Sequence, residues 1–494
     1  MLVKIDNMRT FIRTIGKPIN MLIIKKIIAI WALAAFFFST TLVWTPDGNC
    51  ITIQEERELA KEFMAVVKSQ YPLIEDPVIV DYVNRVGNRI LKSIPPQPFV
   101  YQFHVIHEDV YNAFATPAGH IFVNSGLFAA LDSEEELAGI IGHEIAHVVC
   151  RHISQRIESS KKIGMATLAG MVAGVLLGVG GAGAAAGAVT MGSVAAGQSA
   201  ALAYSRENEM QADQLGLGYL THAGYTGEGL LTSLRKIRSK QWYGSDQIPT
   251  YLTTHPAAEQ RMSYIDNWLH QNRAQTTVKK SPVGGFELAH TRITALYTNT
   301  QLALDHFQKA LNSSPDDPMA NYGYALALTR KDQWHAAAKH MQKAIESNAL
   351  ATYMLQDLGK IYFHEGAFEK ALEALSSSSS SKDLEGQLYL GRTQMELEQF
   401  AEAKATFEKL VRYHQDYTQA YYYLGESSGR LGDMFGAHYN LGRFYQRRGD
   451  MRNAGFHLNR AMKLATNETQ KQMVDHELKS LDSMAKDRKK NPPG

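Results

Sequence analysis

Apolar residues recur with helical spacing in two early stretches of the chain, 53–71 and 81–94. In residues 99–106 the spacing changes, because apolar and aromatic side chains there occupy every second position, which predicts a strand. Residues 112–119 then lead into 120–123, a run that indicates a hairpin or an edge strand. We therefore expect helices and a small β-sheet in this part of the chain.

A longer helical pattern begins at Ser133. Glu136 lies three residues later and fits a capping box, and the acidic first turn suits the helix dipole. The residues that follow, such as Leu137 and Ile145, give the helix an apolar body. Because no helix breaker intervenes, we expect this helix to continue through His152.

The second half of the chain is repetitive. Four large apolar residues, each at the start of a similar run, follow one another at intervals of 34, 32 and 34 residues: Trp334, Phe368, Phe400 and Met434. A period near 34 residues is typical of tetratricopeptide (TPR) repeats, in which each repeat is a helix–turn–helix unit. Such repeats stack into a solenoid with a concave surface, so this part is expected to recruit a protein or a peptide.

Composition narrows the classes of function. A net charge of +2, with 20% charged residues, argues against a dedicated nucleic-acid binder. The only cysteines are Cys50 and Cys150, so the chain is neither a disulfide scaffold nor a cysteine-ligated zinc ribbon. A bridge between the two stays open, beside the simpler interpretation that Cys150 is a small buried hydrophobe.

The N-terminal residues have the pattern of a targeting segment. Basic residues precede an uncharged run over 27–44, which has 18 residues. This order is typical of an export signal, and the run is also just long enough to span a bilayer. We therefore expect residues 1–50 to be an export signal or an N-terminal anchor. The rest of the chain would then lie in the periplasm, either free or tethered to the membrane.

His143, Glu144 and His147 form an H-E-x-x-H sequence inside the long helical pattern. Residues four apart lie on one face of a helix, so both imidazoles can reach one metal ion. Glu144 lies beside that ion and can take a proton from a water molecule. Two unpaired imidazoles inside so apolar a helix would also need a partner, which favours a metal.

The third ligand has to come from another part of the chain. His152 lies nine residues after His143, which on a continuous helix places it roughly 180° around the axis. Glu209 is a better candidate, because it and Asp213 are four residues apart in another helical pattern. Glu209 could complete a His-His-Glu site, and Asp213 could hydrogen-bond a ligand histidine. An acidic pair on a solvated helix is the alternative.

Two motifs together carry a family resemblance. The chain contains His143-Glu144-x-x-His147 and then Ser205-Arg206-x-x-Glu209-x-x-Ala212-Asp213. This combination resembles the gluzincin metalloprotease family of the CAAX prenyl protease and HtpX type, and the repeats resemble its TPR-bearing periplasmic branch. The resemblance implies one Zn²⁺ held by both motif histidines and Glu209, with Glu144 as the catalytic base. Arg206 and Asp213 are then candidates for a supporting role near the ligands.

Two further segments resemble signatures of the same family. Residues 112–126 resemble the strand beside the active site, which can hold an extended substrate by strand addition. Thr254-His255-Pro256 together with Arg261 resembles another signature. It implies that His255 approaches the zinc and takes the position of the water in a self-inhibited state. A capping or surface histidine is the alternative.

Between the two ligand segments lies a stretch over 163–203 that has no charge and many glycines and alanines. By hydropathy it could enter a membrane. Because His143 and Glu209 flank it and have to meet at one metal, it cannot cross a bilayer an odd number of times. A helical hairpin that dips into the membrane, a lid over the site and a pair of buried small-residue helices all stay open.

The expected fold is mainly α, with a zincin-like metallopeptidase domain followed by a TPR α-solenoid. We place the peptidase domain at 51–285, including the apolar insert at 163–203. The repeats follow at 286–485, with a basic tail at 486–494.

The resemblance implies a zinc-dependent endopeptidase that hydrolyses misfolded or unassembled envelope proteins. Its TPR domain would recruit substrates or the outer-membrane assembly machinery. The first alternative is a non-enzymatic TPR assembly factor with a structural metal site. The second is a prenyl-type protease inside the bilayer, which is disfavoured because only the N-terminal residues and the insert could enter a membrane. Contact with a membrane surface stays open, and no nucleic-acid partner is expected.

Overall fold

The computed structural model describes residues 51–159, 204–242, 249–272, 285–346, 351–378 and 383–490. The predicted signal or anchor, the apolar insert and Cys50 lie outside these residues. Within the described ranges, no helix combines the length and the apolarity that crossing a membrane requires.

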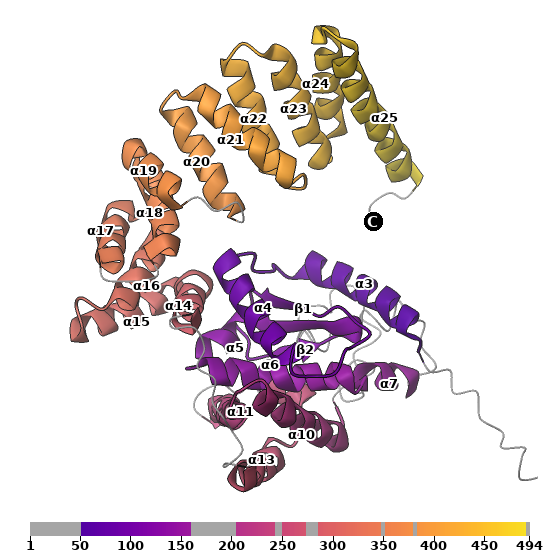
Figure 1. Cartoon of the computed structure of the whole chain (residues 1–494), viewed down its shortest axis with the longest axis vertical. Coiled ribbons are helices and arrows are strands. Elements are labelled where there is room, and N and C mark those ends of the chain that lie inside the picture. The colour runs from indigo at the N-terminus through magenta and orange to yellow at the C-terminus, as the bar shows by residue number, and fades with distance from the viewer. Residues whose placement is uncertain are drawn as a thin grey trace, which may run out of the picture. The chain divides into compact units, whose positions relative to one another are not determined.

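The first part of the described chain is built from helices around a three-stranded sheet (Figure 1). Its elements up to the end of the long central helix are α3 (Ile53–Gln70), α4 (Pro77–Leu91), β1 (Gln102–Ile106), β2 (Ala113–Ala115), the 3-10 turn η1 (Pro117–Gly119), β3 (His120–Asn124), α5 (Ser125–Ala130) and α6 (Glu134–Val149). After these come α7 (His152–Ser159), α10 (Arg206–His222), α11 (Glu228–Trp242), α12 (Thr250–Thr254) and α13 (Ala258–Asn272).

The sheet has the order β1-β3-β2, with β3 in the centre. β1 runs parallel to β3 and pairs Gln102 with His120, whereas β2 runs antiparallel to β3 and forms an edge. The rings of Phe114 and Phe122 on these two strands are buried and stack with their centroids 4.9 Å apart. The small sheet predicted from the sequence is thereby confirmed.

The start of α6 agrees with the sequence only in part. Ser133 is the N-cap, and its Oγ accepts a hydrogen bond from the Glu136 N–H at 3.3 Å. Instead of returning to Ser133, the Glu136 carboxylate accepts from the Asp132 N–H at 2.7 Å and ion-pairs with Lys236 at 2.6 Å. The predicted capping box is therefore wrong in its second half, because a tertiary ion pair draws the Glu136 side chain away.

The end of α6 also differs from the prediction. The helix ends at Val149, and Arg151 has a φ of 55°, in the left-handed region that residues other than glycine rarely occupy. The Arg151 guanidinium donates to the buried Glu56 carboxylate of α3 at 2.5 Å, and this contact holds the chain away from a helical path. α7 then starts at His152, so the predicted continuous helix through this residue is wrong.

α6 is the element around which the first part is packed. Its residues from Glu136 to Val148 are buried. α4 and strands of the sheet pack against it, as do α10 and α11. The contact with α11 depends on Gly139, where an added Cβ would lie 2.5 Å from the backbone nitrogen of Leu230.

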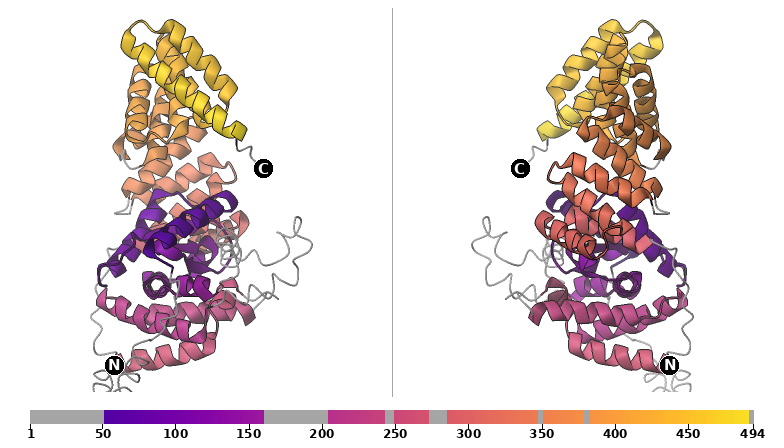
Figure 2. Two further views of the ribbon diagram at one scale, coloured as in Figure 1. Left: turned by 90° about the vertical axis from the view of Figure 1, so that its right-hand side faces the viewer. Right: turned by 90° about the vertical axis from the view of Figure 1, so that its left-hand side faces the viewer.

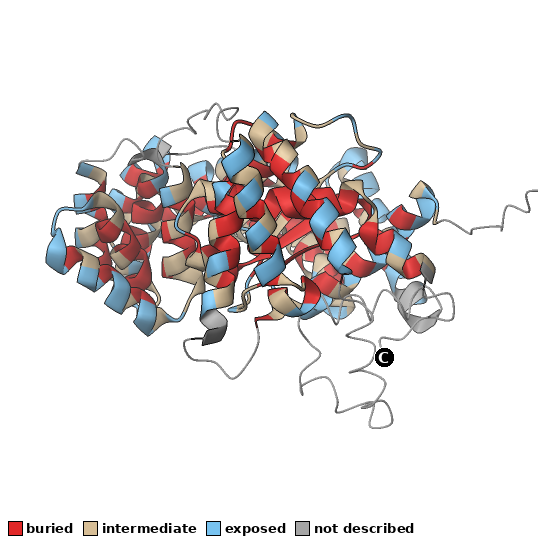
Figure 3. Ribbon diagram, turned by 90° about the horizontal axis from the view of Figure 1, so that it is seen from below, coloured by how far each residue is buried: buried red, intermediate tan, exposed pale blue. Residues whose placement is uncertain are grey.

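The second part of the described chain is a stack of helices (Figures 1 and 2). These are α14 (Gly285–Tyr297), α15 (Thr300–Ser313), α16 (Pro318–Thr329), α17 (Trp334–Glu346), α18 (Ala351–Glu365), α19 (Phe368–Ser378), α20 (Leu384–Glu396), α21 (Phe400–Tyr413), α22 (Thr418–Arg430), α23 (Met434–Arg447), α24 (Met451–Leu464) and α25 (Glu468–Lys490). Figure 3 shows how buried positions gather on the inward sides of helices and exposed positions on their outward sides.

The repeat prediction is confirmed in its period. The four residues that defined the intervals are each the first residue of a helix, namely Trp334 of α17, Phe368 of α19, Phe400 of α21 and Met434 of α23. α25 continues to Lys490, so the first residues of the predicted basic tail are helical. α14 packs against both α4 of the first part and α16 of the repeats, and it therefore joins the two.

Candidate metal centre

Four side chains from three helical segments meet at one point inside the first part of the chain. His143 and His147 lie on one face of α6, Glu209 lies in α10, and His255 follows α12. One potential ligand atom from each lies within 4.8 Å of the others, and all four residues are buried. We call these four residues the donor cluster.

The separations within the donor cluster are those of a compact metal site. His143 Nε2 lies 3.0 Å from His147 Nε2 and 3.5 Å from Glu209 Oε2. His255 Nδ1 lies 3.3 Å from His143 Nε2 and 3.1 Å from Glu209 Oε1. Around one zinc ion with bonds of about 2.0–2.1 Å, tetrahedral ligands are about 3.3–3.4 Å apart. The donor set and its spacing therefore fit zinc.

Each motif histidine is oriented by a contact at its other ring nitrogen. His143 Nδ1 lies 2.8 Å from Asp213 Oδ1, and because an ionised carboxylate only accepts, this nitrogen carries the proton. The lone pair of His143 is then on Nε2, which faces the cluster. His147 Nδ1 lies 3.0 Å from His152 Nδ1, and its Nε2 faces the cluster in the same way.

The donor cluster lies in an excess of negative charge. Glu144, Glu209 and Asp213 are buried carboxylates, and the buried cation among them is Arg261. Arg261 Nε donates to Asp213 at 2.7 Å, and Arg261 Nη1 lies 2.6 Å from Glu209 Oε2 in an ion pair without hydrogen-bond geometry. With all three carboxylates ionised and the two motif histidines neutral, as metal binding requires, two negative charges remain unbalanced, which a divalent cation would neutralise.

Glu144 is buried beside the donor cluster. Both its carboxylate oxygens are buried and have no hydrogen-bond partner among the described residues, and His255 Nε2 lies 3.5 Å from Oε1. Burial raises the pKa of Glu144, against the opposing influence of His255 and His143. A buried carboxylate that no protein group satisfies is costly, so this position calls for a ligand such as water.

The ionisation of the donors follows from the same contacts. Burial lowers the pKa of His147 well below its ordinary value, so its ring is neutral, as a metal ligand has to be. Burial alone would raise the pKa of Glu209, but Arg261 and His255 hold it well below its ordinary value. Burial and Arg261 disfavour a charge on His143, yet Asp213 outweighs them and raises its pKa to about 9. A metal cation at Nε2 would take the place of that proton.

Two tyrosines cover the donor cluster. The ring of Tyr204 stacks on His147 with the centroids 3.8 Å apart, and the ring of Tyr251 stacks on His255 at 4.3 Å. The Tyr204 N–H also donates to the Thr254 carbonyl at 3.0 Å, which ties the start of α10 to the end of α12. The segment that carries His255 is thereby held over the cluster.

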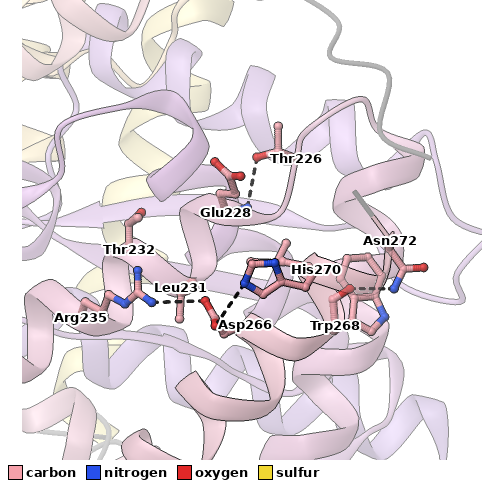
Figure 4. Close-up of a pocket in the computed structure, with 10 residues that line it drawn as sticks. Thr226, Glu228, Leu231, Thr232, Arg235, Asp266, Trp268, His270 and Asn272 are labelled. Atoms are coloured by element: carbon pink, nitrogen blue, oxygen red, sulfur yellow. Dashed lines mark hydrogen bonds and ion pairs between the residues drawn. The ribbon is translucent and has the colours of Figure 1, made fainter. Parts of the chain in front are cut away.

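A cleft of about 350 Å³ lies along α11 and α13, and none of its lining residues belongs to the donor cluster (Figure 4). Asp266 pairs there with Arg235 at 3.3 Å and with His270 at 3.6 Å, beside Trp268. The donor cluster itself is closed, since each of its four residues is at most 1% exposed. The described structure is therefore a form in which the candidate metal centre is shut off from solvent.

The structure brings together most of the residues named from the sequence. These are His143, His147, Glu209 and His255 in the cluster, with Glu144 beside them and Asp213 bound to His143. Arg206, by contrast, is exposed in the first turn of α10 and takes no part in these contacts.

Four neighbours of the cluster were not identified from the sequence, namely Tyr204, Tyr251, Tyr264 and His152. The Tyr264 hydroxyl donates to Asp213, and no local pattern marks any of the three tyrosines as part of a site. His152 could have been noticed, because it is a histidine close after the motif, but a continuous helix would place it on the side away from the metal.

Both parts of the chain are similar to known proteins. Residues 80–269 match peptidase family M48, and residues 329–379, 388–437 and 435–468 match tetratricopeptide repeats. The β-barrel assembly-enhancing protease of Escherichia coli (strain K12) is 27% identical over 348 residues, which are 69% of this chain and 69% of the relative. A putative β-barrel assembly-enhancing protease of Vibrio cholerae is 31% identical over 302 residues, or 60% of this chain and 61% of the relative. The mitochondrial metalloendopeptidase OMA1 of Schizosaccharomyces pombe is 24% identical over 259 residues, or 49% and 70%.

Proposed function

Because the chain carries a peptidase family M48 domain followed by tetratricopeptide repeats, we propose that it is a zinc-dependent endopeptidase whose repeats recruit its protein partners. The observation that supports this most directly is the donor cluster with Glu144 beside it. His143, His147 and Glu209 supply two imidazoles and a carboxylate, which is a ligand set of catalytic zinc sites. Glu144 adds a buried carboxylate that accepts no hydrogen bond from the described residues.

Each residue of the site has its own role in peptide hydrolysis. When bound, zinc supplies Lewis acidity toward the scissile carbonyl and the attacking water. Glu144 takes a proton from that water at its free carboxylate and passes it to the leaving amine. Asp213 holds His143 in the required tautomer, and Arg261 fixes the carboxylates of Asp213 and Glu209.

His255 gives this site a closed form. Its Nδ1 lies among the other donors, at the position that a catalytic site leaves to water. The segment is also fixed at its other end, since the Tyr251 N–H donates to the Tyr111 carbonyl at 3.1 Å, just before the edge strand β2. We infer that this segment has to withdraw before an extended substrate can pair with β2.

The proposed substrates are misfolded or unassembled proteins of the bacterial envelope, and the proposed location is the periplasm. Two observations support this. Relatives of the chain are named for enhancing β-barrel assembly, and the N-terminal residues have the order of an export signal. The repeats would then present substrates, or the assembly machinery itself, to the peptidase domain.

The substitution Glu144→Gln tests the proposal, because it removes the base and keeps the shape of the side chain. We expect cleavage of unfolded casein by the full chain to fall by on the order of 10²–10⁴. Zinc content, measured by mass spectrometry, should stay at one ion per chain. Glu207→Gln, which changes an exposed carboxylate on α10, is the matched control and should cleave normally. Undiminished cleavage by Glu144→Gln would favour the non-enzymatic assembly factor.

A further inference from the structure

His152 has a place in the structure that the proposed mechanism does not use. It is the first residue of α7, directly after the turn that ends α6, and it is 2% exposed. Its Nδ1 lies 3.0 Å from His147 Nδ1, and its Nε2 lies 3.0 Å from Oε1 of Gln211 on α10. A chain of side-chain contacts thus runs from the donor cluster to Gln211, which is exposed.

The direction of the hydrogen bonds follows from the chemistry at the outer end of this chain. The carbonyl oxygen of an amide only accepts, so His152 Nε2 donates to Gln211. A neutral imidazole has one N–H, and His152 Nδ1 is therefore left as an acceptor. His147 Nδ1 then has to donate to it. His147 Nε2 consequently keeps its lone pair, and this nitrogen lies 3.0 Å from His143 Nε2 in the donor cluster.

The two motif histidines are thus oriented by different chemistry. His143 is held by the Asp213 carboxylate, whereas His147 is held by an uncharged histidine and amide. The cluster already contains three buried carboxylates. A fourth one behind His147 would add a further buried charge, and the neutral chain orients the ring without that cost.

We propose that His152 is a positioning residue for metal binding, which with Gln211 holds His147 in the tautomer and ring orientation that direct Nε2 at the metal. This inference rests on the proposed zinc function. Gln211 is exposed, so a charged side chain can be placed at that end without being buried. His152 is buried, and no water can take its place as the partner of His147.

Zinc affinity is the direct readout. His152→Leu keeps a buried apolar side chain but removes the acceptor, and we expect Zn²⁺ to bind roughly 10–100-fold more weakly, measured by competition with a chelating dye. His152→Gln offers an oxygen that can accept from His147, and it should recover most of the lost affinity. His222→Gln, at an exposed histidine of the same α10 helix that carries Gln211, is the matched control and should bind as the parent does.

Substitutions of the exposed Gln211 test the direction of the hydrogen bonds that link it through His152 to His147, without disturbing the core. Gln211→Glu keeps an acceptor, whereas Gln211→Lys can only donate and would reverse both hydrogen bonds. At high salt, which screens the difference in charge, we expect the Glu variant to bind Zn²⁺ like the parent and the Lys variant to bind more weakly. The absorption bands of the Co²⁺-substituted protein should shift in His152→Leu and Gln211→Lys only, since they follow ligand geometry.

Equal zinc affinity and identical Co²⁺ spectra in His152→Leu and the parent would overturn the positioning role. An equal loss in His152→Gln would do so as well, because packing alone would then explain the effect. If His152→Leu does not fold, as judged by circular dichroism of the apo protein, the Gln211→Glu and Gln211→Lys pair decides, and equal affinities refute the role. A parent chain that takes up no zinc, or a Glu144→Gln variant that still cleaves, would instead refute the proposed function.

Discussion

Replacing Arg292 with methionine should loosen the junction between the peptidase domain and the repeats. Arg292 lies in α14, and its guanidinium binds Asp76 at the start of α4 and Asp357 in α18. The Nη2–Oδ2 distance to Asp76 is 2.5 Å. The Tyr322 hydroxyl donates to the same Asp357 carboxylate at 2.7 Å. One buried cation therefore holds two carboxylates that come from different parts of the chain.

The magnitude follows from the burial of this network. The side chains of Arg292, Asp76 and Asp357 are 7%, 5% and 8% exposed. Removing one partner of a buried ion pair costs about 3–5 kcal/mol, because the opposite charge stays buried and unpaired. For an unfolding slope of roughly 2–3 kcal/mol/M, the urea midpoint should fall by about 1–2.5 M.

Tryptophan fluorescence during urea unfolding is the assay, since Trp334 lines the same cavity of about 340 Å³ as Arg292. The matched control is Arg235→Met, which breaks a surface pair with Asp266 whose side chains are 57% and 45% exposed, and it should cost less than about 1 kcal/mol. A midpoint in Arg292→Met no lower than in Arg235→Met would refute the reasoning. Neutralising both carboxylates of the junction with asparagine in the Arg292→Met background should restore most of the stability.

Three further outcomes are expected. Burial alone would raise the pKa of Asp357, but the nearby charges of Arg292 and Lys360 outweigh burial and hold the pKa below its ordinary value. The ionised carboxylate therefore stabilises the fold above about pH 4, and this stabilisation is lost as the pH falls further. The stability gap between the parent and Arg292→Met should therefore shrink below about pH 4 in urea titrations. His255→Ala should raise the rate of casein cleavage while zinc stays bound by the three remaining ligands, and unchanged cleavage would argue against a closed form. Gly139→Ala should lower the thermal midpoint by overpacking α6 against α11, at about 1–3 kcal/mol. Gly218→Ala, whose added Cβ would meet no atom within 4 Å apart from its own helix, should not.

Local patterns in the sequence predicted a large share of the fold and the site. The repeats were predictable because one helix of each begins at a large apolar residue, as α17 does at Trp334 and α19 at Phe368, and because each helix stacks on its neighbours in sequence. The face shared by His143 and His147 follows from helix geometry alone. Glu209 was reached through the resemblance, since spacing left it indistinguishable from a solvated acid.

Contacts between distant segments could not be predicted in the same way. The closure of the site depends on Tyr204, just before α10, stacking on His147 of α6, and nothing near Tyr204 in the sequence indicates this contact. The junction is similar, because Asp76 also caps α4 through the Val78 and Ile79 N–H groups, and this local role is complete without Arg292. Because capping α4 already explains why an aspartate lies at position 76, the sequence gives no sign that Asp76 also binds Arg292.

The end of α6 shows why such contacts matter for function. Cys150 and Arg151 do not break helices, and the helix ends there because Glu56, 95 residues earlier, binds the Arg151 guanidinium and the backbone turns into the left-handed region. On a continuous helix His152 would lie roughly 140° around the axis from His147, out of reach of its ring. The turn returns His152 to the Nδ1 side of that ring, at 3.0 Å. A straight helix would keep His152 away from the metal and from His147, whereas the tertiary contact that ends the helix places the same residue behind the ligand.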